Sequence, residues 1–462
     1  MRLRLGARAL LGGTAAAVTL AVTLLLVLDV SDGGAGTRES RRHPLSTCFW
    51  EGPISMKRPS TAGFDGHYFN FPEQSATYWL ARFTIPQGAA LRLRGRYAHA
   101  RYQSLNAYSA GEPTDSLYDV QIRPRRGSTN PFVAGHRRNR HKRRYAVSVV
   151  DQAPPASAAA RRPNTLYAKP GGEGPIELLY RTYEPDKGRD LTGGTGLPSP
   201  RLRLADGTRL RGRAACGRIN DSNRSIPVLT TPEDQWKTFW NAPGCDPAAA
   251  PAVNPVRWKR FFNFDHARLG VALGCSDAGY LAHQQLPAED RGGFYSNRDI
   301  RYLYAFVSRH FGEVVVVQAR MPTVPKTRRG QRRMGSGQLR YWSLCSAESA
   351  VTSRSEDCLA DREVPLAPGR EFTIVVSTPE QRPANAVRGC GVAWLRWPQG
   401  GDGAGRPDFA TLIVRNMLPA PGFAEAIQNV KRLGDEQQVM GPYFPRASYT
   451  SRSAFEAGGC SG

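Results

Sequence analysis

The sequence predicts a mostly β protein: two tandem jelly-roll-like antiparallel sandwiches, short helices between them and at the C-terminus, and an N-terminal transmembrane helix. Three observations lead to this fold. The 462 residues include 47 Gly and 35 Pro, which favours many turns between short elements. Apolar and polar residues alternate along several short segments, as they do in half-buried strands. The string Arg-Tyr-x-Ser-Leu occurs twice, at 101–105 and 340–344, which indicates an internal repeat.

The first element is an uncharged segment from Ala9 to Leu28, preceded by three arginines within the first eight residues. About 20 apolar residues are enough for a helix to cross a bilayer, and flanking arginines stay on the cytoplasmic side. We therefore expect residues 1–30 to form a signal-anchor or transmembrane helix and residues 31–47 to form a linker. The rest of the chain would then lie outside the cytoplasm, anchored in the cell membrane. A cleaved signal peptide and a secreted protein are the alternative.

The eight cysteines all follow this segment. In an oxidising compartment, an even number of cysteines indicates disulfides, and the absence of Cys-x-x-Cys gives no support for a zinc site. We expect Cys48 to pair with Cys216, since they begin and end the first module, and Cys345 to pair with Cys358 across a short loop. Spacing alone leaves other pairings open. The remaining cysteines are Cys390 and Cys460, both late in the second module, and Cys245 and Cys275.

The first module spans residues 48–225 and carries the clearest strand pattern. In segment 91–97, Leu91, Leu93 and Tyr97 share one face, whereas three arginines share the other. Such alternation is typical of antiparallel strands with one buried face. The strands expected in this module are 78–86, 91–97, 101–105, 116–122, 144–150 and 177–185.

The second module spans residues 291–462 and repeats these segments in the same order. The corresponding strands are expected at 301–309, 313–321, 340–344, 358–364, 370–376 and 411–419. Short strands separated by turn residues favour a β-sandwich over alternating strands and helices. An up-and-down barrel is the alternative architecture.

The connector between the modules, residues 226–290, has a different composition. Thr231 followed by Pro, Glu and Asp predicts a helix start with Thr231 as its N-cap, and Pro243 with Gly244 ends that helix. A second helix is expected over residues 423–433, stopped by Gly434. We expect these helices to cover sheet edges or join the modules.

The net charge of +24 makes a polyanionic partner a hypothesis. Two basic clusters occupy residues 136–144 and 325–333. Neither is interleaved with aromatic residues that could stack on bases, so we expect no specific nucleic acid. An anionic wall polymer, a glycan or anionic lipid is the partner that this charge indicates. Solvated loops without a partner are the alternative interpretation.

Two strings resemble the family catalogued as domain of unknown function 1214. That family has an aromatic-Trp-Ser-Leu strand, matched by residues 341–344, and an Arg-x-Tyr-x-Pro strand, matched by residues 181–185. The equivalent segments 102–105 and 415–419 lack the Trp and the Tyr, so neither module keeps both motifs. The resemblance covers about the second half of each module and implies a jelly-roll-like fold with no assigned reaction. The chain is also rich in arginine and poor in lysine. With this composition and the two strings, it resembles exported actinobacterial proteins.

The candidate binding residues come from the repeated strings. Arg181 shares a strand face with Leu179 and Tyr183, and Arg415 shares one with Ile413 and Met417, so each guanidinium needs a partner among apolar neighbours. One interpretation pairs these arginines with Asp119 or Asp361. The other places them in a cleft for a sugar or an acidic ligand. The full set is Arg101, Tyr102, Asp119, Arg181, Tyr183, Arg340, Tyr341, Trp342, Asp361 and Arg415.

No pattern identifies a reaction. There is no Gly-x-Ser-x-Gly, and the histidines form neither His-x-His nor His-Glu-x-x-His, so catalytic residues stay unknown and we expect no metal and no cofactor. The loop at 191–198 is glycine-rich but lacks the end of a phosphate-binding loop, which favours a turn. The sequence therefore predicts an anchored, extracytoplasmic envelope protein that binds a wall glycan, a lipid or a protein. An exported hydrolase of an envelope glycan and a structural scaffold are the alternatives, and the oligomeric state stays open.

Overall fold

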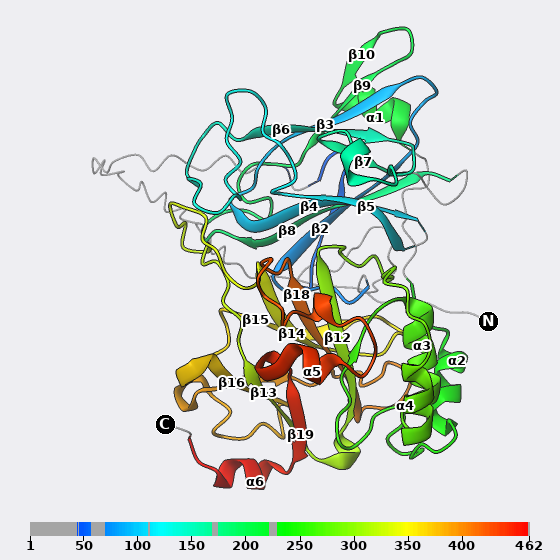
Figure 1. The fold of residues 1–462 in the computed structure, drawn as a ribbon, viewed down its shortest axis with the longest axis vertical. Coiled ribbons are helices and arrows are strands. Elements are labelled where there is room, and N and C mark those ends of the chain that lie inside the picture. The colour runs from blue at the N-terminus through cyan, green and yellow to red at the C-terminus, as the bar shows by residue number, and fades with distance from the viewer. Residues whose placement is uncertain are drawn as a thin grey trace, which may run out of the picture. The chain divides into compact units, whose positions relative to one another are not determined.

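The computed structural model describes residues 44, 46–56, 70–109, 111–168, 174–220 and 229–460 (Figure 1). Residues 42–462 form one compact unit. The protein is mostly β, with several sheets of antiparallel strands and short helices, which confirms the fold class at this level. The predictions for residues 1–30 and for most of 31–47 lie outside the described residues. Among the described residues, no helix combines the length and apolar character needed to span a bilayer.

The first half of the chain forms two five-stranded sheets. The first sheet has the order β1 (Glu51–Ile54), β2 (Ala76–Phe83), β8 (Ile176–Pro185), β4 (Ala100–Ser109) and β5 (Glu112–Tyr118). The second has the order β10 (Arg209–Arg211), β9 (Ser199–Arg203), β3 (Ala90–Arg96), β6 (Arg144–Val150) and β7 (Thr165–Tyr167). Their facing residues, among them Trp79, Leu93, Val147 and Leu178, form one buried cluster.

The second half forms two further sheets. One has the order β11 (Lys259–Arg260), β12 (Ile300–Ser308), β18 (Phe409–Met417), β14 (Tyr341–Ala347) and β15 (Ser355–Ala360). The other has the order β17 (Val392–Arg396), β16 (Glu371–Ser377), β13 (Val314–Arg320) and β19 (Arg446–Thr450). Leu303, Val317, Leu344 and Ile374 belong to the buried cluster between them.

The two halves share their strand order. The first sheets correspond strand by strand, and β9-β3-β6-β7 corresponds to β19-β13-β16-β17. In both halves the last of these pairs is parallel, β6 with β7 and β16 with β17, whereas the other pairs are antiparallel. The register agrees too, because Ser104 lies opposite Arg181 and Ser343 lies opposite Arg415. The repeated string therefore occupies the same place in the same sheet of each half.

Short helices lie mainly between the halves and near the C-terminus. The α-helices are α1 (Arg213–Ile219), α2 (Glu233–Thr238), α3 (Phe264–Leu273), α4 (Asp277–Gln284), α5 (Glu436–Met440) and α6 (Arg452–Ala457). The 3-10 helices are η1 (Ala158–Ala160), η2 (Phe239–Asn241), η3 (Arg309–Phe311), η4 (Pro368–Arg370), η5 (Arg388–Cys390), η6 (Ile427–Asn429) and η7 (Gly441–Tyr443).

Two helix predictions need correction. The helix expected from Thr231 begins at Glu233, with Pro232 rather than Thr231 in the N-cap position. The helix expected over residues 423–433 is only the 3-10 turn η6. Phe423, Ala426, Ile427 and Val430 are all buried in the core of the second half, so packing around an irregular chain replaces a helix with one apolar face.

Both expected disulfides form, and the remaining four cysteines pair as Cys245–Cys275 and Cys390–Cys460. Cys48–Cys216, Cys245–Cys275, Cys345–Cys358 and Cys390–Cys460 have Cα–Cα distances of 6.0, 5.4, 4.0 and 4.6 Å. The first closes the first half, as its position in the sequence predicts. Every cysteine of the chain is accounted for by these pairs.

Candidate functional site

A cavity of about 140 Å³ is lined by residues from both halves and from the connector. The first sheet of each half supplies one wall, through β2 and β8 in the first half and β12 and β18 in the second. Helices α2 and α3 and the segment 293–297 supply much of the rest, and single residues of other loops, among them Phe71 and Phe261, complete the wall. The connector helices therefore form part of a cavity wall, a role beyond the edge-covering one that the sequence predicts.

Nearly half of the residues that line the cavity are aromatic. Rings from well separated segments contact one another around the cavity, with Phe294 5.4 Å from Phe71, 6.2 Å from Phe261 and 4.8 Å from Phe264. Tyr302 lies 6.3 Å from Phe261 in an edge-to-face arrangement. Such a wall favours an apolar or aromatic group over a strongly hydrated one.

The charged residues that line the cavity are all arginines. They are Arg181 on β8, Arg415 on β18 and Arg268 on α3, and no aspartate, glutamate or lysine is found among the described lining residues. Arg181 and Arg415 are 2% and 3% exposed, whereas Arg268 is exposed. The wall thus combines aromatic rings with positive charge alone.

Strand alternation directs Arg181 to this cavity. Leu178 and Tyr180 belong to the core of the first half, whereas Leu179 and Tyr183 belong to a buried cluster that also contains second-half residues. Arg181 lies on the face of Leu179 and Tyr183, as the sequence predicts, because successive strand residues point to opposite faces.

Neutral partners surround Arg181. One Nη donates to Asn106 Oδ1 at 2.8 Å and the other to the backbone oxygen of Tyr295 at 2.5 Å. The guanidinium lies 5.6 Å from the ring of Tyr78 and 5.4 Å from that of Tyr108. Burial by itself would lower the pKa of Arg181, but the surrounding tyrosines hold this pKa above its usual value, so the group stays charged. Its Nε has no hydrogen-bond partner among the described residues.

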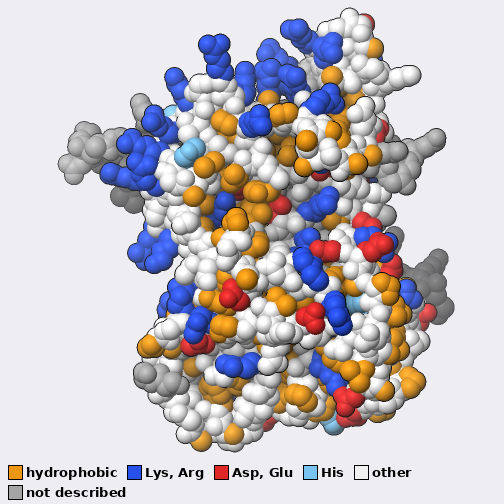
Figure 2. All heavy atoms as spheres, viewed as in Figure 1, with side chains coloured by type: hydrophobic (Ala, Val, Ile, Leu, Met, Phe, Trp, Pro, Cys, Tyr) orange, Lys and Arg blue, Asp and Glu red, His pale blue; other side chains and the backbone are white. Residues whose placement is uncertain are grey.

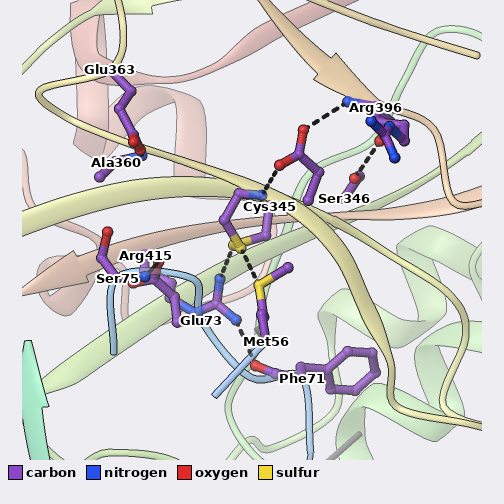
Figure 3. Close-up of a disulfide and its surroundings, with 12 residues drawn as sticks. Met56, Phe71, Glu73, Ser75, Cys345, Ser346, Ala360, Glu363, Arg396 and Arg415 are labelled. Carbon is purple, nitrogen blue, oxygen red and sulfur yellow. Dashed lines mark hydrogen bonds between the residues drawn. A yellow bond between two sulfur atoms is a disulfide. The ribbon is translucent and has the colours of Figure 1, made fainter. Parts of the chain in front are cut away.

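Arg415 occupies the equivalent place in the second half (Figure 3). One Nη donates to Cys345 Sγ at 2.7 Å and the other to the backbone oxygen of Phe71 at 2.9 Å. Its guanidinium lies 5.8 Å from the ring of Tyr302. Within the described part of the chain, neither Arg415 nor Arg181 forms an ion pair with a carboxylate.

Glu73 is the acid that interacts electrostatically with Arg415. Burial raises the pKa of Glu73, and the positive charge of Arg415 only partly opposes this rise. Glu73 also lies with Cys345 and Cys358, but these two cysteines form a disulfide and offer no thiolate. This group therefore does not make a metal centre.

The prediction that Arg181 or Arg415 pairs with Asp119 or Asp361 is wrong. Each aspartate instead forms an ion pair with an arginine of the repeated string, and each of these ion pairs joins the two halves. Arg101 donates to Asp361 at 2.5 Å, and Arg340 donates to Asp119 at 3.2 Å. The aspartates directly follow β5 and β15. Each carboxylate also accepts a backbone N–H of its own half, Asp119 from Gln103 at 3.1 Å and Asp361 from Trp342 at 3.4 Å. Burial raises the pKa of Asp119 to about 6, against the effect of Arg340.

The predicted aromatic residues divide between the interface and a core. Tyr183 lies 5.5 Å from Tyr102 and 5.5 Å from Tyr341, which joins the two halves through three rings. Of these, Tyr183 lines the cavity. Trp342 instead packs 5.3 Å from Phe372 in the core of the second half. Of the predicted set, the structure brings Arg181, Tyr183 and Arg415 together at the cavity.

The glycine-rich loop at 191–198 binds the carboxylate of a neighbouring residue, Asp190. Asp190 Oδ1 accepts hydrogen bonds from the backbone N–H groups of Thr192 and Gly194, at 2.8 and 2.9 Å. The loop is thus a turn closed by Asp190, in keeping with the expectation.

Most of the aromatic wall is absent from the residues predicted from sequence. Phe261 and Phe264 belong to the string Arg-Phe-Phe-Asn-Phe at 260–264, and Phe294 with Tyr295 belongs to Gly-Gly-Phe-Tyr-Ser at 292–296. The signal that could reveal them is aromatic density at the end of the connector and the start of the second module, next to a segment rich in proline and alanine.

Comparisons with known proteins add no family. No family model matches the chain, and no curated protein matches it. An uncharacterized protein from Burkholderia cenocepacia is similar in structure, with 14% identity, a TM-score of 0.42, and coverage of 83% of this chain and 78% of that one. The VPA0106 protein from Vibrio parahaemolyticus is similar with 10% identity, a TM-score of 0.37, and coverage of 84% and 93%. The resemblance to domain of unknown function 1214 stays a prediction.

Proposed function

We propose that this protein is a non-enzymatic binding protein that holds a small organic anion with an apolar body in the cavity between its halves. One observation carries the proposal: two buried guanidinium groups and aromatic rings line the cavity, with no acidic side chain among the described lining residues. Such a site would take a carboxylate or a phosphate attached to an aromatic or aliphatic group.

The anionic group follows from the cost of burying charge. Glu73 and Asp299 act on Arg415 and Arg181 only through space, without a hydrogen bond to them. A buried guanidinium without a directly bound carboxylate is unfavourable, and neutral hydrogen bonds offset only part of its lost hydration. A ligand carboxylate or phosphate would supply that negative charge through charge-assisted hydrogen bonds, which are the strongest that arginine makes. The unpartnered Nε of Arg181 supports this choice.

The apolar body follows from the wall and the volume. A cavity of about 140 Å³ is close to the roughly 150 Å³ that accommodates benzene in an apolar protein interior. Of the three ligand classes that the sequence predicts, a lipid-like acid fits this wall better than a glycan, whose hydroxyl groups need many polar partners.

The alternatives have less support. A glycan hydrolase needs two carboxyl groups facing one cleft, but Asp119 and Asp361 are committed to ion pairs with Arg340 and Arg101. These same pairs favour a purely structural scaffold as the second candidate, in which the cavity would bind nothing.

We place the protein outside the cytoplasm, anchored through residues 9–28, as two copies of one jelly-roll-like sandwich. The four disulfides support an oxidising compartment. N-terminal sequencing of the protein from membranes tests the anchor, because an intact N-terminus is expected there, and cleavage after residue 28 would contradict it.

Titration of the full chain with benzoate and phenyl phosphate tests the binding site. Benzyl alcohol and benzylamine, the neutral and cationic counterparts, serve as ligand controls. We expect the anions to bind at least about tenfold more tightly than benzyl alcohol, and R181Q and R415Q each to remove this preference, since a charged hydrogen bond contributes roughly 1.5–3 kcal/mol. R260Q removes a buried arginine outside the cavity and is the matched control.

Three results would contradict the proposal. One is equal binding of anionic and neutral probes, and another is an anion preference that folded R181Q and R415Q retain. Failure of both anions to bind while R415Q is as stable as the wild type would favour the scaffold. R268Q, at an exposed position, keeps the test informative if the buried variants do not fold.

A further inference from the structure

The outer face of the β10-β9-β3-β6 sheet is covered with arginine. In Figure 2, Lys and Arg side chains gather at the top of the view, over β3, β9 and β10. Along β3, residues Arg92, Arg94 and Arg96 are exposed while Leu91 and Leu93 are buried. We call the following set the arginine face: Arg92, Arg94, Arg96, Arg144, Arg201, Arg203, Arg209 and Arg211.

The strand register places these positive charges directly against one another. Arg92 lies opposite Arg201, and Arg96 lies opposite Arg144. On the next pair of strands, Arg201 and Arg203 lie opposite Arg211 and Arg209. Like charges at opposed positions of a sheet are destabilising, so the sheet keeps this arrangement against its own stability.

Acidic partners do not offset this repulsion. Among the described residues, no arginine of the arginine face forms an ion pair, although many arginines elsewhere do. The nearby cations Arg125, Arg201 and Arg92, together with desolvation as the largest cause, lower the pKa of Arg94. The charge of the face is therefore available to an external partner.

An arginine-rich composition does not account for the face, because the equivalent sheet of the second half lacks it. There, Val314, Val316, Val375 and Val392 form an apolar cluster that Phe455 of α6 also contacts. Arg320 on β13 is paired with Glu371 at 3.3 Å. Two sheets with the same strand order and the same overall composition thus differ in the residues that point outward.

Two basic segments extend the arginine face. Residues 136–144 and 325–333 come from different halves but join through an antiparallel bridge between Arg137 and Arg333. Backbone hydrogen bonds from Arg138 to Arg332 and from Met334 to His136, at 2.8 and 2.9 Å, hold them together. Arg96 donates to the backbone oxygen of His141 at 3.0 Å, which connects the joined segments to the face.

We propose that the arginine face docks onto the anionic headgroups of a phospholipid membrane. The charges extend in two directions, along β3 and across four strands, which matches a planar array of phosphates better than a single linear polymer. Guanidinium groups bind phosphate oxygens in a bidentate manner. Among the described residues, none of the exposed large hydrophobic side chains lies on these strands, so the contact would be with headgroups rather than by insertion.

Vesicle binding of the full chain tests this docking. The quantity measured is the ratio of affinities for phosphatidylglycerol-containing and pure phosphatidylcholine vesicles, since segment 9–28 can enter both. We expect the wild type to prefer anionic vesicles and to lose the preference at high salt. R92Q/R94Q/R96Q should lower the ratio by roughly two orders of magnitude, since each arginine near an anionic surface contributes about fivefold.

The matched control is R320Q/R396Q/R446Q, which removes the same charge from the equivalent sheet of the second half and should leave the ratio unchanged. An equal ratio in the wild type and in R92Q/R94Q/R96Q would overturn the proposal, as would an equal loss in the control. Tighter binding to soluble linear polyphosphate than to anionic vesicles, at equal phosphate concentration, would assign the face to a polymer and overturn the membrane assignment.

Discussion

The sheets β9-β3-β6-β7 and β19-β13-β16-β17, which we call the outer sheets, have the same strand order but present different surfaces. In the first half, β3 directs Arg92, Arg94 and Arg96 outward. In the second half, β13 directs Val314 and Val316 into an apolar cluster that Phe455 of α6 contacts. Cys390 belongs to the same cluster, and its disulfide with Cys460 links the cluster to the chain after α6. Strand pairing and the inner core thus fix the topology, while the outward positions are free to acquire other roles.

The sheets that face each other across the interface, β1-β2-β8-β4-β5 and β11-β12-β18-β14-β15, are more alike. Arg181 and Arg415 face the same cavity, each beside a tyrosine of the neighbouring strand, Tyr78 or Tyr302. These residues lie at the interface, where a change in one half must fit the other half as well. The comparison teaches that interface residues, rather than surface residues, retain the evidence of the repeat.

The two reciprocal ion pairs across the interface, Arg101–Asp361 and Arg340–Asp119, give the largest expected difference. Arg101 and Asp361 are 2% and 3% exposed at the side chain, whereas Arg340 is 14% exposed. D361A should therefore lower the free energy of unfolding by about 3 kcal/mol, the lower end of the range for a broken buried ion pair. Arg101 then keeps only the more distant Glu184, 3.8 Å away, as a carboxylate partner. D119A should cost less, about 1–3 kcal/mol, because water reaches Arg340.

Urea denaturation of both variants measures this difference. A larger loss for D119A than for D361A would contradict the role that we assign to burial. D408A, which removes an exposed partner of Arg309, is the control and should change stability by less than about 1 kcal/mol.

The edge strands β1 and β11 provide a second comparison. Glu51 on β1 lies opposite Leu80 on β2, and Lys259 on β11 lies opposite Tyr304 on β12. Lys259 is buried, and its Nζ donates to the backbone oxygen of Gly270 at 2.8 Å. Burial, together with Arg257, lowers the pKa of Lys259 from 10.5 to about 7. The folded protein thus binds fewer protons than the unfolded chain between these pH values, so its stability should rise with pH across this window.

K259M should remove this pH dependence and raise stability near pH 7 by on the order of 1–3 kcal/mol. This is less than the roughly 5 kcal/mol that the shift from 10.5 to about 7 gives at about 1.4 kcal/mol for each unit of pKa, because the variant also loses the hydrogen bond to Gly270. Thermal denaturation from pH 6 to pH 10 measures the effect. K237M, at an exposed lysine, should keep the wild-type profile. An unchanged profile in K259M would show that Lys259 is not the group responsible.

The arginine face gives the smallest expected effect on stability. R92Q/R94Q/R96Q should raise the free energy of unfolding by less than about 1 kcal/mol at low salt, because opposed like charges are removed. Salt should stabilise the wild type through this region and leave the variant less affected. R320Q/R396Q/R446Q should give no increase, since it breaks the pair of Arg320 with Glu371. Equal effects of the two triple variants would remove the distinction between the faces.

Much of the fold could be predicted from the sequence because strand alternation and the repeated string are local signals. Segment 91–97 gives its buried and exposed faces directly, and the position of Cys48 and Cys216 at the ends of one module gives their pairing. The failed helix at 423–433 shows the limit of local signals. Its buried residues Phe423, Ala426, Ile427 and Val430 have the spacing of a helix face, yet the segment forms only the 3-10 turn η6. The apolar period alone therefore does not decide the element.

The candidate site could be predicted only in part. The sequence places Arg181 and Arg415 among apolar residues, but it assigns the wrong acids to them, because the partner of each repeated group lies in the other half. The aromatic wall depends on Phe261, Phe264 and Phe294, whose approach is set by tertiary packing. Sequence patterns that describe one strand at a time do not contain that information.

The crossed ion pairs have one more consequence. Arg101 and Arg340 are equivalent residues, as are Asp119 and Asp361. Each half therefore gives its arginine to the aspartate of the other half and receives the other half's arginine in return. This reciprocity is what a twofold axis imposes on an isologous homodimer. Either half expressed alone would therefore expose the charged and aromatic residues that contact with the other half buries.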